Sequence, residues 1–378
     1  MIMDIPYIVF YSILLVLAFM YKKKSNKNIA ICSFVLTFFF FAFRAPVVGA
    51  DTWDYIRYLT GERNFYNYDT RELETGFVIY RSLISSITSS RFIVMIINSI
   101  LILFPFFGVL KYSSNIPFSL FVFFNLNGMS IYFCALRQLL AFSCFLVAVL
   151  YYMNNDSNKI KKYIVLFIAG LIGQFLHTSS IIYVVLFFLV TLIGNVNKKI
   201  YLFLIIGSAL VGIVLESFDS LSFLKNLSLW FSLSPVERLS GYLSIDELFD
   251  DRSLTLLLRP SFLFLIALYF LSSEDLSHPF CKFSLFGVVL FNLFGYIPII
   301  YRLCVPFFVF LTIVFAWIFD KKYTSITKYR VRSIVVILVS LYFVRSVIID
   351  CTEYDINTAT KMHPYQFIFQ EYHDRIIR

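Results

Sequence analysis

Long runs of apolar residues, separated by short polar stretches, follow one another along almost the whole chain. Each run is close to the about 20 residues that a helix needs to cross a bilayer, so the pattern predicts about twelve membrane spans. The chain is therefore predicted to be an all-α, polytopic membrane protein, with one membrane domain over residues 1–349 and a short tail over 350–378. The predicted spans are 5–21, 29–46, 91–110, 116–133, 137–153, 163–177, 179–194, 200–215, 254–271, 283–300, 303–319 and 333–349.

Two longer polar stretches interrupt this pattern, at 47–90 and 216–253, and we interpret them as large loops. Within the first, residues 74–90 are too polar to span and predict an amphipathic helix at the membrane interface. A second amphipathic helix is expected around 237–242. The apolar run 116–133 contains Asn125-Leu-Asn-Gly128. This is typical of a broken or tilted helix beside a cavity, although an imprecise reading of the run's ends would look the same.

The composition excludes a soluble protein. Of the 378 residues, 60% are hydrophobic and only 15% are charged, whereas soluble domains are about one quarter charged. The six cysteines lie mostly inside apolar runs without CxxC spacing, which favours small core residues over disulfides or a metal site. The first run has neither a basic leader nor a small-residue cleavage site, so we expect it to be retained as a span.

Lysine and arginine separate along the chain, and this predicts its orientation. There are 16 of each. When successive connections are assigned to alternating sides, 14 lysines fall on one side and 14 arginines on the other or at its membrane edge. The lysines occupy the short loops that the positive-inside rule governs, so their side is predicted to be cytoplasmic. Both termini and the two large loops then face outward.

The predicted outer face also carries 19 of the 23 acidic residues. Arginine presents a planar fork of donors that suits phosphate and carboxylate. We therefore interpret this face as a polar working surface, while surface ion pairs of little energetic value remain the alternative for the residues at the loop centres.

The first candidate residues are Arg44, Asp51 and Tyr55, just after the second predicted span. Asp51 and Tyr55 are four residues apart and share one face if 51–59 is helical. Asp51 is then a candidate proton acceptor and Arg44 a candidate anion clamp. Alternatively, Asp51 caps that helix.

Glu74 stands at the start of the predicted interfacial helix and is the second candidate base. A charge there also suits the helix dipole, which would make it a weaker base, so Asp51 is favoured. Arg137 and Gln138 open a predicted span and suggest a lined cavity, although an arginine at this depth can also snorkel to the interface.

His177 is the one histidine of four next to a predicted outward-facing membrane edge and is the next candidate for the base. A lone histidine is also compatible with a purely structural role, and no second His or Cys stands at metal-ligand spacing. Arg238 and Tyr242 lie on one face of the helix expected in the second loop. Arg302 lies at another membrane edge.

Motifs for binding nucleotides, nucleotide sugars or catalytic metals are absent from the sequence. Without such motifs, the protein would need a substrate that is already activated and that reaches it through the membrane. Clustered arginines and a carboxylate at the bilayer edge suit a lipid-linked diphosphate: arginine stabilises the leaving diphosphate, and the carboxylate takes a proton from an attacking sugar hydroxyl.

In order and identity, these motifs resemble the EpsG-like branch of the bacterial O-antigen and exopolysaccharide polymerases (Wzy type). The resemblance covers about residues 30–320 and rests on six short motifs: Arg44…Gly49-x-Asp51…Tyr55, Glu74-x-Gly76-Phe77, Leu136-Arg137-Gln138-x-x-Ala141, Phe175-Leu176-His177-x-Ser179-Ser180, Glu237-Arg238-x-x-x-Tyr242 and Tyr301-Arg302.

The resemblance implies a glycosyltransferase of the bacterial inner membrane that works on the periplasmic face without a cofactor or metal. It would transfer a growing glycan from undecaprenyl diphosphate to a new lipid-linked repeat unit, beside a flippase and a chain-length regulator and without nucleic acid. Arg44, Arg137, Arg238 and Arg302 would contact the diphosphate or glycan. Gln138, Tyr55 and Tyr242 would support them, and the base would be Asp51, Glu74 or His177.

Two other classes of membrane protein are alternatives to a polymerase. A flippase or exporter of lipid-linked sugars should place charges in mid-span and on both sides, whereas the arginine clusters here are one-sided. An O-antigen ligase uses the same chemistry with a lipid A acceptor, and only the motif resemblance separates it from a polymerase. A purely structural scaffold fits the arginine enrichment least well.

Overall fold

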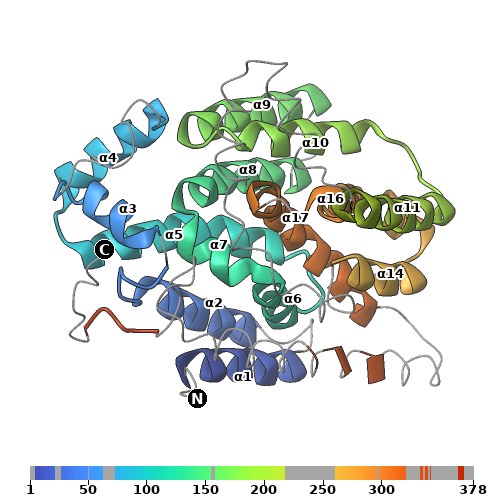
Figure 1. The fold of residues 1–378 in the computed structure, drawn as a ribbon, viewed down its shortest axis with the longest axis horizontal. Helices are drawn as coiled ribbons and strands as arrows, with labels where there is room; N and C mark the ends of the chain where they lie inside the picture. Colours follow the sequence, from blue (N-terminus) through green and yellow to red (C-terminus); the bar gives the residue numbers. More distant parts are fainter. Residues whose placement is uncertain are drawn as a thin grey trace. The chain divides into compact units, whose positions relative to one another are not determined.

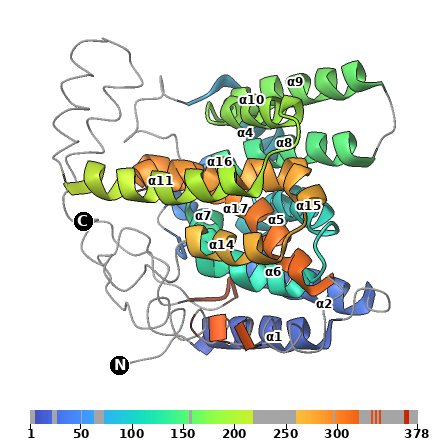
Figure 2. The same ribbon diagram turned by 90° about the vertical axis from the view of Figure 1, so that its right-hand side faces the viewer.

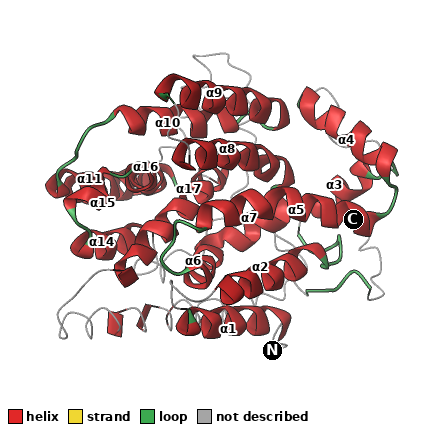
Figure 3. Cartoon of the chain, turned by 180° about the vertical axis from the view of Figure 1, so that it is seen from behind, coloured by secondary structure: helices red, strands yellow, loops and turns green. Residues whose placement is uncertain are grey.

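The computed structural model describes residues 5–21, 27–49, 51–62, 73–154, 158–217, 260–295, 298–320 and four short pieces nearer the C-terminus, namely 333–334, 337–338, 341 and 365–369. The regular structure of these residues is helical (Figures 1 and 3). The helices are α1 (Ile5–Met20), α2 (Lys27–Ala42), α3 (Thr52–Leu59), α4 (Thr75–Ile87), α5 (Arg91–Leu110), α6 (Ile116–Phe123), α7 (Met129–Cys134), α8 (Leu136–Asn154), α9 (Lys159–Leu176), α10 (Ser180–Leu192), α11 (Lys198–Ser217), α14 (Pro260–Phe270), α15 (Ser273–Ser277), α16 (Pro279–Phe294) and α17 (Pro298–Ala316).

Four segments of these helices are long and apolar enough to cross a membrane: Arg91–Leu110, Leu136–Asn154, Lys198–Leu215 and Ile300–Phe319. Several further helices are apolar but shorter, among them α1, α2, α10 and α16. Together they indicate a multi-pass membrane protein. The predicted spans up to residue 319 coincide with described helices over most of their length, although 254–259 and 296–297 lie outside the described residues, as does most of 333–349. The number of membrane crossings therefore stays a prediction.

The chain divides into two compact units, Met1–Leu189 with Phe319–Arg378, and Val190–Ile318. In the first unit, α1 packs on α2 and α6, α2 on α5, α5 on α8, and α8 on α9. In Figures 1 and 3, α3 and α4 lie together at one end of this stack. That end carries most of the candidate residues described below.

The second unit is built around α16 and α17, which pack closely along each other, and α11 runs beside α16 (Figure 2). The approach of α11 to α16 is closest at Gly212, where a side chain would collide with the backbone of Asn292. The buried Asn292 amide donates to the Ser208 hydroxyl (2.9 Å) and to the Ile205 carbonyl (3.2 Å). A small residue and a satisfied polar group thus join two apolar helices, as is common inside membranes.

Basic residues lie at opposite ends of the first unit according to their type. Arg91 and Arg137 stand at the N-terminal ends of α5 and α8. At the other ends of the same two helices, the Lys111 ammonium donates to the Asn154 side chain (2.7 Å). Since 20 helical residues span about 30 Å, the arginine end and the lysine end are separated by roughly the thickness of a bilayer. Which end faces the periplasm stays a prediction.

The apolar run 116–133 is helical throughout, with one irregular turn. Between α6 and α7 the chain forms a π-helical turn over Phe124–Gly128, where the Asn125 amide donates to the Phe121 carbonyl (2.8 Å). Ala135 then leaves the helical conformation (φ −114°, ψ 52°) before α8 begins. The run is therefore one continuous helix with a π-helical turn at Phe124–Gly128, and the break predicted within it comes after it, at Ala135, which places Arg137 in the first turn of α8.

Residues 365–369 return to the end of α2. The Ala45 amide donates to the Gln366 carbonyl (2.7 Å), and the Ile368 amide donates to the Phe43 carbonyl (2.8 Å). The Tyr365 hydroxyl donates to the Phe40 carbonyl (2.6 Å). The segment thus pairs in extended form with the turn that carries Arg44.

Candidate functional site

Arg137 lies at the centre of a polar cluster at the arginine end of the first unit. One terminal nitrogen, Nη1, donates to Oε2 of Glu74 at 2.5 Å, and Nε donates to the Tyr55 hydroxyl at 3.1 Å. Its guanidinium also lies over the rings of Tyr55 and Phe77, 5.7 and 5.9 Å from their centroids. The other terminal nitrogen, Nη2, has no hydrogen-bond partner among the described residues. An arginine held on two sides is thus fixed in direction while it keeps a donor for a ligand.

Glu74 directly precedes α4, yet its side chain does not cap that helix. It turns to Arg137 instead, and only 15% of the Glu74 side chain is exposed. The close approach of α4 to α9 makes this possible, because a Cβ on Gly76 would lie 2.6 Å from both Cβ and the carbonyl oxygen of Phe175. Gly76 therefore sets the position of Glu74.

Tyr55 belongs to α3, whose buried face packs toward α4 and α5. Burial raises the pKa of the Tyr55 hydroxyl, and the negative charges of Asp51 and Glu74 raise it further against the opposing effect of Arg137. The hydroxyl therefore keeps its proton at neutral pH. Asp51 stands at the N-cap position of α3, but its side chain makes no capping hydrogen bond. The negative charge of Asp51 is close enough to Tyr55 to raise the pKa of its hydroxyl.

His177 follows the last residue of α9 and faces the same cluster. Its Nδ1 is 2.7 Å from the Ser179 hydroxyl, and it also accepts from the Ser179 amide at 3.3 Å. Burial lowers the pKa of His177 to about 4, while the charge of Glu74 opposes this shift and that of Arg137 adds to it. The imidazole is therefore neutral at physiological pH and adds no positive charge.

A surface groove of about 330 Å³ lies beside the cluster, between the start of α4 and the end of α9. Glu74 lines it, so this carboxylate stands between the groove and Arg137. The other lining residues are Thr75, Leu171, Gln174, Phe175 and Thr178.

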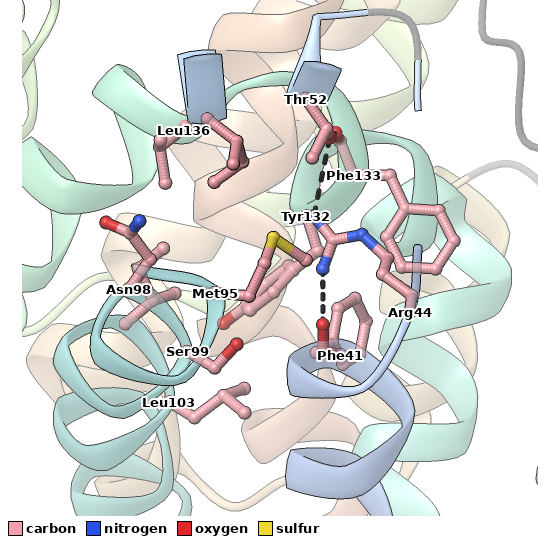
Figure 4. Close-up of a pocket in the computed structure, with 12 residues that line it drawn as sticks. Phe41, Arg44, Thr52, Met95, Asn98, Ser99, Leu103, Tyr132, Phe133 and Leu136 are labelled. Atoms are coloured by element: carbon pink, nitrogen blue, oxygen red, sulfur yellow. Dashed lines mark hydrogen bonds between the residues drawn. The ribbon is translucent and has the colours of Figure 1, made fainter. Parts of the chain in front are cut away.

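Arg44 occupies a separate, buried place (Figure 4). It donates to the Phe41 carbonyl (2.7 Å), the Val48 carbonyl (3.4 Å) and the Thr52 hydroxyl (3.4 Å), and it lies over the Phe133 ring at 4.6 Å. Burial lowers the pKa of Arg44 to about 10. Within the part of the chain that is described, no carboxylate pairs with it.

The adjoining cavity, about 30 Å³, has room for a single water molecule and not for a diphosphate. Thr52 in turn donates to the Phe133 carbonyl at the end of α7. Arg44 and Thr52 therefore hold the start of α3 against the break before α8, and so place Tyr55 opposite Arg137.

The remaining candidates lie elsewhere. The buried Gln138 amide donates to the Tyr183 hydroxyl of α10 at 2.8 Å and joins two helices. Arg302 lies on α17 of the second unit, with an exposed side chain. Arg238 and Tyr242 fall outside the described residues. The structure thus brings together Asp51, Tyr55, Glu74, Arg137 and His177.

Comparison with protein families now adds an independent observation. The model of the EpsG family matches residues 27–367, which is most of the chain. The chain belongs to the EpsG family. This family is associated with exopolysaccharide biosynthesis. A search of curated proteins and a search of solved structures returned no match.

The EpsG match includes every candidate residue and also the segment that pairs with the Arg44 turn, as far as Phe367. The motif resemblance ends near residue 320 and implies nothing for this segment. The sequence also indicates no role for Thr52 or Ser179, since a hydroxyl bonded to one distant carbonyl or to a nearby ring leaves no periodic signal.

No group of three or more His, Cys, Asp or Glu side chains that could hold a metal ion occurs among the residues that the structure describes. What the cluster offers is a fixed guanidinium, two carboxylates, a protonated phenol and a neutral imidazole. This set can bind an oxyanion at one point and accept a proton at another.

Proposed function

We propose that this EpsG-family protein is a polysaccharide polymerase that uses polyprenyl-diphosphate-linked sugars. The cluster of Arg137, Glu74 and Tyr55 at one end of the membrane helices is the observation that carries the proposal. A partly buried arginine with one donor still available suits a phosphate group, because guanidinium binds phosphate oxygens in a directed, charge-assisted way.

In the proposed reaction, a hydroxyl of the lipid-linked acceptor glycan attacks the anomeric carbon of the donor glycan. The new glycosidic C–O bond forms as the bond between that carbon and the diphosphate oxygen breaks. The electron pair of the broken bond leaves with the diphosphate, and Nη2 of Arg137 stabilises the growing negative charge. The proton of the attacking hydroxyl goes to a carboxylate.

We assign the role of base to Asp51. Glu74 is already bound to Arg137, so taking a proton would break its ion pair. The Asp51 side chain does not serve as a helix cap, and the protonated Tyr55 beside it can orient the carboxylate by donating a hydrogen bond. Glu74 then serves to aim Arg137, and His177 remains the next candidate for the base.

As the motif resemblance implies, we also assign Arg238 and Arg302 to contacts with the diphosphate or glycan. Tyr242 and Gln138 complete the proposed substrate contacts as the resemblance implies, and Arg44 supports the site from within.

The proposed setting is the periplasmic face of the bacterial inner membrane. The substrate would be undecaprenyl-diphosphate-linked oligosaccharide, delivered by a flippase, and a chain-length regulator would act in the same membrane. Neither a nucleotide nor a metal enters the proposed chemistry.

The experiment is complementation of a deletion strain, with surface glycan resolved on a gel. The deletion should reduce the ladder to core plus one repeat unit, whereas loss of all glycan would indicate a flippase or ligase. Asp51→Asn should nearly abolish the ladder, since a positioned general base contributes ~10²–10⁴-fold. Asp54→Asn, on the same short helix, is the matched control and should polymerise normally.

Glu74→Gln should shorten the ladder but retain measurable long chains, because the amide can still accept a hydrogen bond from Arg137. If the Asp51 and Glu74 phenotypes are exchanged, Glu74 is the base. If both variants polymerise normally at wild-type protein levels, neither carboxylate is the base and the proposed mechanism fails.

A further inference from the structure

The groove beside Glu74 is lined by both polar and apolar residues. Its polar lining comes from Glu74, Thr75, Gln174 and Thr178, of which Glu74 binds Arg137, whereas Leu171 and Phe175 supply apolar surface. A site of this kind suits a ligand that is itself divided into a charged head and an apolar body.

The apolar lining continues as an exposed stripe along α9. Ile160, Ile164, Phe167, Leu171 and Phe175 have relative exposures of 64%, 51%, 57%, 39% and 60%. Their spacing of four, three, four and four residues places them on one face of the helix. Fifteen residues of helix cover about 22 Å, so the stripe runs through much of the hydrocarbon layer and ends at the groove.

The other wall of the groove comes from α4, which is amphipathic. Phe77 and Ile84 are buried against the protein, while Ile79, Leu83 and Ile87 are more than half exposed. A short helix that exposes apolar side chains beside polar ones fits the membrane interface. The groove therefore opens at the depth where a lipid head group meets its chain.

We propose that this groove holds the isoprenoid chain of the polyprenyl diphosphate donor where it joins the head group. The proposal rests on the proposed function and adds the place of the lipid. The chain would lie along the α9 stripe, and the diphosphate would reach Nη2 of Arg137 past Glu74.

One observation favours this lipid over a membrane phospholipid. Among the described residues, the α9 stripe leads into this groove at Leu171 and Phe175, and a polyprenyl diphosphate carries a single long chain to lie along it, whereas a phospholipid carries two. Its diphosphate also complements the available donor of Arg137, the ion-pair partner of Glu74 in the groove wall.

The test uses photocrosslinking in lipid nanodiscs of phosphatidylethanolamine and phosphatidylglycerol that contain undecaprenyl diphosphate. A photoreactive benzoylphenylalanine replaces Leu171, which lines the groove, or Ile172, which is 51% exposed on the neighbouring face of α9. The Leu171 position should capture undecaprenyl diphosphate several-fold more than the Ile172 position. Equal capture at both positions, or phospholipid alone at Leu171, would overturn the proposal.

A second pair of variants gives a kinetic readout. Leu171→Trp should fill the groove and raise KM for the lipid donor with little change in kcat, which is the signature of lost ground-state binding. Ile172→Trp should leave both constants unchanged. The same increase in KM in both variants would contradict a specific groove.

These readouts are separable from the proposed chemistry. Selective capture at Leu171 together with normal polymerisation by the Asp51 and Glu74 variants would leave the groove standing and refute the mechanism. Loss of polymerisation in the Asp51 variant without selective capture would do the reverse.

Discussion

Arg137 uses two different nitrogens for two partners, and this distinguishes it from an arginine that merely snorkels. Its Nε and Nη1 reach Tyr55 and Glu74 at the same time, and the Arg137 side chain is only 23% exposed. An ion pair at this depth is worth more than a surface pair, but part of its Coulomb energy is offset by desolvation. Its clearest effect is to fix the direction of a guanidinium.

Arg137→Lys is therefore expected to be a poor replacement. The three donors of a lysine radiate from one nitrogen, so they cannot reach Tyr55, Glu74 and a phosphate in the directions that Nε, Nη1 and Nη2 of the planar guanidinium do. Loss of one charge-assisted hydrogen bond costs about 1.5–3 kcal/mol, so polymerisation in a membrane assay should fall by about 10–100-fold. Arg91→Lys is the matched control, because Arg91 also binds a glutamate with two nitrogens but stands outside the cluster. Activity of R137K within about twofold of wild type would refute the role.

The buried His177 should make stability depend on pH. Its pKa of about 4 in the folded state lies below the ordinary value of 6.5. The unfolded chain therefore takes up a proton as pH falls below about 6.5, while the folded protein does not until about 4. Stability should be constant above pH 6.5 and decrease between 6.5 and 4. Thermal unfolding of the detergent-solubilised protein over this range measures the decrease.

His177→Gln should flatten that decrease. His278, at the start of α16, is a useful control because burial likewise lowers its pKa to about 4. His278→Asn keeps a side chain that can cap the helix, so it should reduce the same slope while leaving polymerisation intact. A wild-type unfolding temperature that does not change between pH 6.5 and 4.5 would contradict the assignment for both histidines.

At the scale of elements, the site depends on how closely α4 approaches α9. Gly76 permits the contact with Phe175, and the contact brings Glu74 within reach of Arg137. Arg137 is positioned by the segment before α8, which contains the π-helical turn between α6 and α7 and the break at Ala135. Two local departures from regular helix therefore create one cluster. Such departures are often found at functional sites.

Gly76→Ala is expected to push α4 away from α9. Overpacking of this kind costs about 1–3 kcal/mol, so the unfolding temperature should fall, and polymerisation should fall more than stability accounts for because Glu74 is displaced. The matched control is Gly207→Ala in α11, where nothing lies within 4 Å of the added methyl group. That change should be neutral or slightly stabilising, since alanine favours helix over glycine by about 1 kcal/mol. Normal activity of G76A would show that the close approach does not position the site.

For the whole molecule, the separation of lysine and arginine predicts an orientation that labelling can measure. Single cysteines at Ser25, Ser157 and Ser325, in a cysteine-free background, should be protected from a membrane-impermeant reagent added outside. Cysteines at Asn67 and Ser244 should be labelled. These five positions lie outside the described residues, but their places in the loops follow from the chain order. The reversed pattern would place the cluster in the cytoplasm and end the proposed mechanism.

The helices were the more predictable part of this molecule. The span 91–110 agrees with α5 at both ends, because Arg91 and Lys111 bound a clean apolar run. The predicted start of α9, at residue 163, is too late. Lys159–Lys162 form the first turn of the helix, although their charges are typical of a loop. Polar residues continue a helix wherever their side chains can reach water, and composition alone does not reveal that.

The sequence predicts which residues belong to the candidate site better than it predicts the contacts between them. The grouping of charged residues at one membrane edge singled out Glu74 and Arg137, but only the fold places them 2.5 Å apart. Arg44 looked equivalent to Arg137 in sequence, yet its donors face main-chain carbonyls and the Thr52 hydroxyl inside the protein. Whether an arginine at a span end faces a ligand or the backbone depends on the turn that follows it, which carries no periodic signal.

The extended pairing of residues 43–45 with 366–368 has a consequence for the time course of biosynthesis. The hydrogen bond from Tyr365 to Phe40 joins positions 325 residues apart, and at 5–20 residues per second the ribosome needs roughly 16–65 s to cover that distance. During this interval α2 has been made and the turn after it has no extended partner. A nascent chain released early would keep the whole Glu74–Arg137 cluster in its sequence but could not complete the pairing that holds the Arg44 turn. Ribosomes stalled before Tyr365 should therefore carry chains in which that turn is open to proteases, and release of the full-length chain should close it.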